Sequence, residues 1–170
     1  MKKSNHYSSF MTGILIGFSI LFFCSASYII YNFILASKIN HLQKQIKSIE
    51  YNNPGSTKLN LLNSDINSDN ISVVIDKLRS DKSISSIDLS ENNIGDQGAI
   101  ILADELTNNI SLQEVTLWTN EIGDEGAVAL AKAIQANRTL KILDLTNNKI
   151  GFKGAEALEE AKREGLEIYY

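Results

Sequence analysis

Histidine, cysteine and proline are scarce in this sequence of 170 residues, and their positions exclude several kinds of chemistry. Residues 56–170 contain neither histidine nor cysteine, which rules out His-dependent serine or cysteine catalysis and His- or Cys-ligated zinc in that region. Cys24 is the only cysteine, so no disulfide can form within the chain. The sequence therefore predicts a protein that is not an enzyme, with no catalytic residues, no metal site and no cofactor.

Charge is absent from a long stretch near the N-terminus. Residues 4–37 contain no Lys, Arg, Asp or Glu, and the stretch from Phe10 to Ala36 is mostly apolar. A helix of this length is about 40 Å long, whereas a bilayer core is about 30 Å thick and needs about 20 apolar residues. Lysines flank the stretch on both sides. We predict a short polar and basic N-terminus at residues 1–9 and a single-pass transmembrane anchor at residues 10–36.

A cleaved signal peptide is the alternative interpretation of this stretch. Met11–Phe23 would be its apolar core and the small residues at 24–26 its cleavage site, and the mature protein would then be secreted. Apolar residues resume at once in Tyr28–Ala36, which favours an uncleaved signal-anchor. The flanking lysines do not decide the orientation of such an anchor, because their numbers on the two sides are similar.

Two weak patterns indicate self-association. Gly13 and Gly17 form a small-xxx-small pair, which lets two membrane helices approach closely. Residues 37–50 are predicted to form an amphipathic helical stalk, and Pro54 ends the helix within a linker at residues 51–57. A weak homodimer and a stalk without a partner are both compatible with the stalk's spacing. Its apolar residues follow a heptad pattern: Leu35, Ile39, Leu42, Ile46 and Ile49.

Internal repetition is the strongest signal in the sequence. A pattern of apolar residues and one asparagine runs from Leu112 to Ile122, and it recurs at one constant period, earlier from Ile84 to Ile94 and later from Leu140 to Ile150. Each copy begins with alternating apolar residues, which predict a strand, and continues with apolar residues at helical spacing, which predict a helix. A degenerate copy precedes the three clear ones and the last copy frays. Such atypical terminal units are expected in a repeat array.

The pattern resembles that of the leucine-rich-repeat family, in particular its ribonuclease-inhibitor type, which also occurs in the sensor regions of NOD-like receptors. The resemblance covers about residues 56–170, and the domain is predicted at residues 58–170, with about 3.5 to 4 repeats of about 28 residues. It implies a curved solenoid with parallel strands inside and helices outside. The predicted fold class is therefore α/β, a short leucine-rich-repeat solenoid preceded by one N-terminal transmembrane helix.

Asn92, Asn120 and Asn148 recur at one position of the repeat. The resemblance implies that they form the family's asparagine ladder, in which side-chain amides bond to backbone groups of the turn after each strand. The Gly-Asp-x-Gly-Ala segments that follow are predicted to begin helices, with each aspartate near the positive end of its helix. The chain has Asn-x-Ser/Thr sequons at Asn70, Asn109 and Asn137, and the last two occupy the same repeat position. They are interpreted as repeat consensus rather than as glycosylation sites.

The resemblance also implies that a partner binds on the concave strand face. The outward positions are mostly polar or acidic, with Trp118, the only tryptophan, among them. Trp118 is either an anchor for a partner or a side chain packed along the edge of the solenoid. The predicted partner-binding residues are Trp118, Glu114, Thr116, Ile142, Asp144 and Asp88.

Charge restricts the kind of partner. Residues 56–170 carry 11 Lys and Arg and 19 Asp and Glu, a net charge of −8, so no nucleic acid is expected to bind. We predict a membrane-anchored protein–protein interaction module that binds a protein partner through its concave face. The alternative is a secreted leucine-rich-repeat binding protein, such as an inhibitor or a bacterial effector, released by signal-peptide cleavage.

Overall fold

The computed structural model describes the backbone of residues 5–170 and the side chains of residues 26–50 and 52–170. The chain divides into two compact units, residues 1–38 and residues 39–170. Helix α1 (Asn5–Asn52) contributes to both units, and all other described helices and strands belong to the second.

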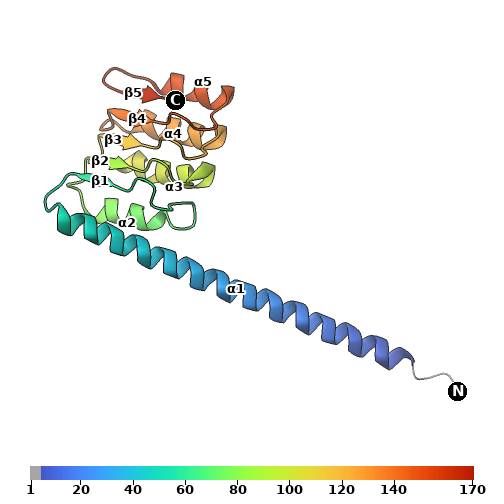
Figure 1. Cartoon of the computed structure of the whole chain (residues 1–170). Coiled ribbons are helices and arrows are strands. Elements are labelled where there is room, and N and C mark those ends of the chain that lie inside the picture. Colours follow the sequence, from blue (N-terminus) through green and yellow to red (C-terminus); the bar gives the residue numbers. More distant parts are fainter. Residues whose placement is uncertain (1–4) are drawn as a thin grey trace. The chain divides into compact units, whose positions relative to one another are not determined.

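Strands and helices alternate along the second unit, and the five strands form one parallel sheet in chain order (Figure 1). The helices that follow the strands line the other side of the sheet in the same order. This arrangement confirms the predicted α/β repeat with parallel strands. The elements are β1 (Lys58–Asn60), α2 (Ser72–Ser80), β2 (Ser86–Asp88), α3 (Gly95–Asn108), β3 (Glu114–Thr116), α4 (Asp124–Ala136), β4 (Ile142–Asp144), α5 (Phe152–Ala161) and β5 (Glu167–Tyr169).

The strand register follows the sequence period until the last repeat. Ser86 lies beside Glu114, and Glu114 lies beside Ile142, so the steps from β2 to β4 are equal and match the period. From β4 to β5 the step is shorter, because Ile142 lies beside Glu167, whereas the period would place Tyr170 there. The final connection includes Gly165, whose φ of +77° favours glycine. The shorter step explains why a fixed period did not predict β5.

The core lies between the sheet and the helices. The central residue of every strand is buried, as are the apolar residues of the helices that face the sheet. Alternation in the strands therefore places one residue inside and its two neighbours outside. Each buried Leu, Ile or Val contributes about 1.5–3 kcal/mol, which is how stacked units stabilise one another. The central strand residues are Leu59, Ile87, Val115, Leu143 and Ile168.

The C-terminal part of α1 covers the first repeat. Leu42 is 1% exposed and Ile46 is also buried, and both belong to the same core cluster as the repeats. Gln45 Nε2 donates a 2.7 Å hydrogen bond to the hydroxyl of Ser64, which occupies the ladder position of the degenerate first copy. The apolar side of the predicted stalk is therefore used within the chain. A second copy could pack against it only if this contact were lost.

The last repeat is closed by polar side chains. The guanidinium of Arg163 donates to the carbonyl oxygens of Ile134 and Leu140, at 3.0 and 2.9 Å. It thereby supplies hydrogen-bond donors to carbonyl groups at the C-terminal end of α4. At the end of α3, the side chain of Asn137 supplies the donor. Tyr170 donates to Glu159 and lies under the ammonium group of Lys162, 5.5 Å from the ring centre. These groups give the end of the array a polar surface.

The predicted transmembrane helix is the part of the fold class that the structure corrects. In the part of the chain that the structure describes, no helix is both long enough and apolar enough to cross a bilayer. Residues 26–36 are the described portion of the predicted span. The other portion, residues 10–25, lies outside the described side chains, as do Gly13 and Gly17. What the structure supports is the α/β repeat domain alone.

Candidate functional site

The outward side of the sheet, which we call the strand face, contains all the predicted partner-binding residues. Each strand contributes two outward residues, and β1 to β4 are each followed by one further position of the repeat. The register aligns these residues in three rows that cross the strands. The first row is Lys58, Ser86, Glu114, Ile142 and Glu167, the second is Asn60, Asp88, Thr116, Asp144 and Tyr169, and the third is Leu62, Ser90, Trp118 and Thr146.

The six predicted residues lie on three adjacent strands. Glu114, Thr116 and Trp118 come from β3 and the position that follows it, in the middle of the sheet. Asp88 is on β2, and Ile142 and Asp144 are on β4. The predicted residues thus form one patch on one face. Whether this patch binds a partner stays a prediction.

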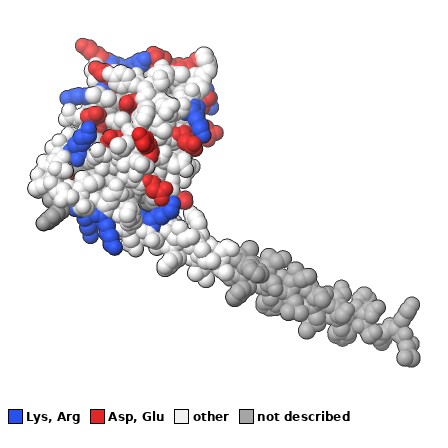
Figure 2. Space-filling view, viewed as in Figure 1, with Lys and Arg blue, Asp and Glu red and all other residues white. Residues whose placement is uncertain are grey.

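The strand face is acidic. Its three rows carry one basic residue, Lys58, and four acidic residues, a net charge of −3. In the part of the chain that the structure describes, none of the ion pairs involves any of these acidic residues. Figure 2 shows acidic side chains over much of the repeat domain, with groups of Lys and Arg between them. The four acidic residues of the strand face are Asp88, Glu114, Asp144 and Glu167.

Hydrogen bonds fix the positions of these carboxylates. Asp88 Oδ1 accepts from the backbone N–H of Ser90 at 3.0 Å, and Asp144 Oδ1 accepts from both the N–H and the hydroxyl of Thr146. Glu114 Oε2 accepts a 3.1 Å bond from the hydroxyl of Ser86. The carboxylates are thus held in place by neutral donors, so their negative charges are not cancelled by a neighbouring cation.

Trp118 is 39% exposed at the end of the central strand. The residues at the same position of the adjacent repeats are small and polar, the buried Ser90 on one side and Thr146 on the other. The indole ring therefore presents a large apolar surface among small polar groups, which is a common property of residues that anchor a protein partner.

The asparagine ladder residues lie behind the strand face and hold adjacent repeats together. Asn120 is completely buried; its Nδ2 donates to the carbonyl of Leu89 in the preceding repeat and to that of Trp118. Its Oδ1 accepts from the N–H of Ile94. Asn92 and Asn148 make corresponding bonds to the repeats before them. These contacts are structural and leave no side-chain group of Asn120 for a ligand.

A second set of inter-repeat bonds was not predicted. Asp96 lies in the first turn of α3, as expected, but its Oδ1 accepts from the N–H groups of Gly123 and Gly126 at the start of α4. Asp124 repeats the arrangement toward α5. Gly126 permits this approach, since a Cβ there would lie 2.8 Å from Asp96 Oδ1. The carboxylates therefore cap the helix of the following repeat.

The sequon asparagines serve the same structural purpose. Asn109 and Asn137 are both 3% exposed, and each accepts hydrogen bonds from two backbone N–H groups that follow it. Asn137 Nδ2 also donates to the carbonyls of Leu106 and Asn109. Both side chains thus make contacts that recur with the repeat, which agrees with repeat consensus, and that interpretation stays a prediction.

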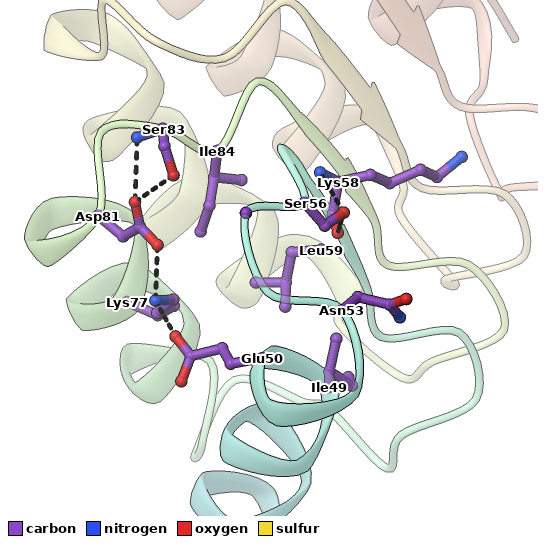
Figure 3. A pocket seen from close by; sticks show the side chains of 11 residues that line it. Ile49, Glu50, Asn53, Ser56, Lys58, Leu59, Lys77, Asp81, Ser83 and Ile84 are labelled. Atoms are coloured by element: carbon purple, nitrogen blue, oxygen red, sulfur yellow. Dashed lines mark hydrogen bonds and ion pairs between the residues drawn. The ribbon is translucent and has the colours of Figure 1, made fainter.

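A separate open pocket lies where α1, the linker and α2 meet (Figure 3). Its apolar lining includes Ile49, Leu59 and Ile84, and its polar side is formed by the ion-paired Lys77. Lys77 Nζ bonds to both Glu50 and Asp81, and thus links the end of α1 to α2. Because the carboxylates of Glu50 and Asp81 are already paired with Lys77, this side of the pocket offers little charge to a ligand and holds the end of α1 in place.

The ion pair between Lys77 and Asp81 shifts the pKa of both residues. Partial burial lowers the pKa of Lys77, but the hydrogen bonds to Asp81 and Glu50 outweigh this effect, so its pKa is raised. The hydrogen bond from Lys77 is the main cause that lowers the pKa of Asp81 from 3.8 to about 2, and hydrogen bonds from Ser83 add to it. Charged Asp81 therefore stabilises the folded state above its ordinary pKa, and this contribution is lost as pH falls through about 2.

Asp81→Asn tests this ion pair, because asparagine has the shape of aspartate without its charge. Asparagine also occupies the same repeat position at 109 and 137. We expect the variant to melt at a lower temperature than the wild type at neutral pH, and the difference to disappear as pH approaches 2. The loss at neutral pH should be under about 1 kcal/mol, since the pair is partly solvated. Thermal unfolding at a series of pH values measures it, and a difference that does not depend on pH would contradict the assignment.

No group of three or more His, Cys, Asp or Glu side chains is arranged to hold a metal ion, as far as the described residues extend.

Comparison with known proteins identifies the repeat. Residues 80–103, 108–131 and 136–158 match the family model of the leucine-rich repeat. Among solved structures, the chain is similar to "Leiomodin-1 Actin-Binding Site 2 (ABS2)", with a TM-score of 0.64 and 22% identity, covering 74% of this chain and 76% of that chain. At this identity the likeness shows a shared fold. Comparison with curated proteins finds no match. Three segments of this chain therefore match leucine-rich repeats, a similarity that suggests a protein–protein interaction module, and the ribonuclease-inhibitor type stays a prediction.

Proposed function

We propose that this chain binds a protein partner through the strand face, with Trp118 as the central contact. The observation that carries the proposal is the exposure of the only tryptophan at the end of the middle strand, between the small residues Ser90 and Thr146 of the adjacent repeats. Tryptophan is prominent among the few residues that supply most of the binding energy of an interface, and such residues lie near its centre.

The geometry supports a small interface of modest affinity. Five strands spaced by about 4.8 Å make a face about 19 Å wide, which is small beside the roughly 800 Å² per partner of a standard interface. We expect a dissociation constant in the micromolar range for one copy. The actin binding named for the leiomodin domain is not carried over, because that likeness is one of fold. The location of the protein, including the secreted alternative, stays a prediction.

The proposal predicts that Trp118→Ala weakens partner binding by about tenfold or more, as is usual for a central aromatic contact. Phe152→Ala is the matched control, since Phe152 is an exposed aromatic residue at the start of α5, away from the strand face. The full-length wild type and both variants are used to capture proteins, which are quantified by mass spectrometry. Proteins lost only with Trp118→Ala are then purified and titrated against all three chains. Partners that bind the two variants equally well would refute the proposal.

A further inference from the structure

The acidic residues of the strand face are regularly spaced. Asp88 and Asp144 are in the same row on β2 and β4, and Glu114 and Glu167 are in the neighbouring row on β3 and β5. The members of each pair are two strands apart, which is about 9.6 Å. Lys58, the one basic residue of the face, lies on β1, so the acidic region covers the other four strands.

The distance between paired carboxylates determines which backbone conformation lets an extended segment, crossing the strands, place side chains over both of them. In a polyproline II segment, every third residue is on the same side and lies about 9.3 Å from the last, which matches the pairs. In a β-conformation, residues on the same side are about 6.8 Å apart, which matches neither one strand nor two. A segment with basic side chains three residues apart can therefore place two positive charges over the two carboxylates of one row.

Resting on the proposed function, we infer that the strand face binds an extended cationic protein segment in the polyproline II conformation, with Lys or Arg at every third position. The carboxylates are held by hydrogen bonds and, among the described residues, none of the ion pairs supplies them with a cation. A basic segment supplies those cations at a surface that is open on one side. Trp118, next to these rows, adds an aromatic face on which an arginine can stack.

Neutral variants of the same shape isolate the charges. Asp88→Asn, Glu114→Gln and Asp144→Asn, combined in one chain, keep an oxygen at each position where the backbone N–H or hydroxyl donates. The matched control combines Glu125→Gln, Glu156→Gln and Glu160→Gln, which are exposed acidic residues of α4 and α5. Both triple variants change the net charge by the same amount, so a general charge effect would affect them equally.

The experiment is a selection of random twelve-residue displayed peptides on the full chain, on both triple variants and on Trp118→Ala. We expect the wild type and the control triple variant to enrich peptides with Lys or Arg at every third position, and the strand-face triple variant not to do so. Enriched peptides that need Trp118 but are neutral or acidic would overturn the inference and leave the proposed function intact. Enrichment that is the same on all four chains would count against both, and no enrichment on the wild type would overturn the inference.

Defined peptides then test the spacing. One labelled peptide carries three arginines separated by Pro-Ser, and a second has the same composition with the three arginines adjacent. We expect the first to bind the full chain more tightly than the second, to lose about tenfold in affinity to the strand-face triple variant, and to weaken as salt is raised. Equal affinity of the two peptides would show that charge alone, without the polyproline II spacing, accounts for binding and would overturn the inference.

Discussion

Asn120→Ala is expected to lower the free energy of unfolding by about 1–3 kcal/mol, because a buried group left without a hydrogen-bond partner costs that much. The substitution removes a donor from the buried carbonyl of Leu89 and an acceptor from the N–H of Ile94. No water can reach these groups without opening the contact between two repeats, since Asn120 has no exposed surface. Thermal and urea unfolding of the full chain measure the loss.

Gln113→Ala is the matched control for this prediction. Gln113 is an amide residue of the same repeat, and it is exposed at the beginning of β3. Its substitution should leave the unfolding midpoint unchanged within about 0.5 kcal/mol, as is usual for exposed sites. Equal midpoints for Asn120→Ala and the wild type would show that the hydrogen bonds of Asn120 do not stabilise the array.

The fold of the repeats follows from the sequence, because the two periodicities in each repeat carry most of the information. Alternating residues such as Val115 and Leu117 predict which side of a strand is buried, and the recurrence of Asn120 predicts the ladder position. Strand β5 could not be found in the same way, since its distance from β4 departs from the period. A fixed period identifies only the repeats that keep it.

The contact between α1 and the first repeat shows a second limit of predicting structure from the sequence. The spacing of Leu42 and Ile46 indicates that one side of the helix is apolar, but the same spacing serves a second copy of the chain and the chain's own core equally well. Only the fold shows that this side contacts the first repeat. The heptad pattern therefore predicted the buried side of the helix without indicating what covers it.

The caps made by Asp96 and Asp124 were partly visible in the sequence. The helix dipole favours each aspartate at its own helix, and it gives no reason to expect a bond to the helix of the next repeat. The repeat position of these caps is aspartate in two repeats and Phe152 in the last clear copy. Among the described residues no helix follows α5, so at position 152 there is no following helix to cap. The acidic rows of the strand face likewise required the strand register, because the sequence alone does not align Glu114 with Glu167.

Leu42→Ala should destabilise the domain by about 2–5 kcal/mol, the usual cost of removing a large side chain from a core. Leu42 is almost fully buried and belongs to the core cluster formed by the repeats. Lys44→Ala is the control, because Lys44 lies on the exposed side of the same helix. Thermal unfolding of both variants at several protein concentrations measures the loss. A loss that appears only where the wild type is dimeric would show that Leu42 serves a contact between copies instead.

The effect of Leu42→Ala should also be local, because each repeat contacts only its neighbours. Hydrogen exchange is expected to increase in β1 and α2, whose Leu59 and Leu78 share the core with Leu42, and to change little in β4 and β5. A uniform increase through β5 would instead indicate that the array unfolds as a single unit. The local result would establish the end of α1 as the cap of the first repeat, in the same way that Arg163 and Tyr170 close the last one.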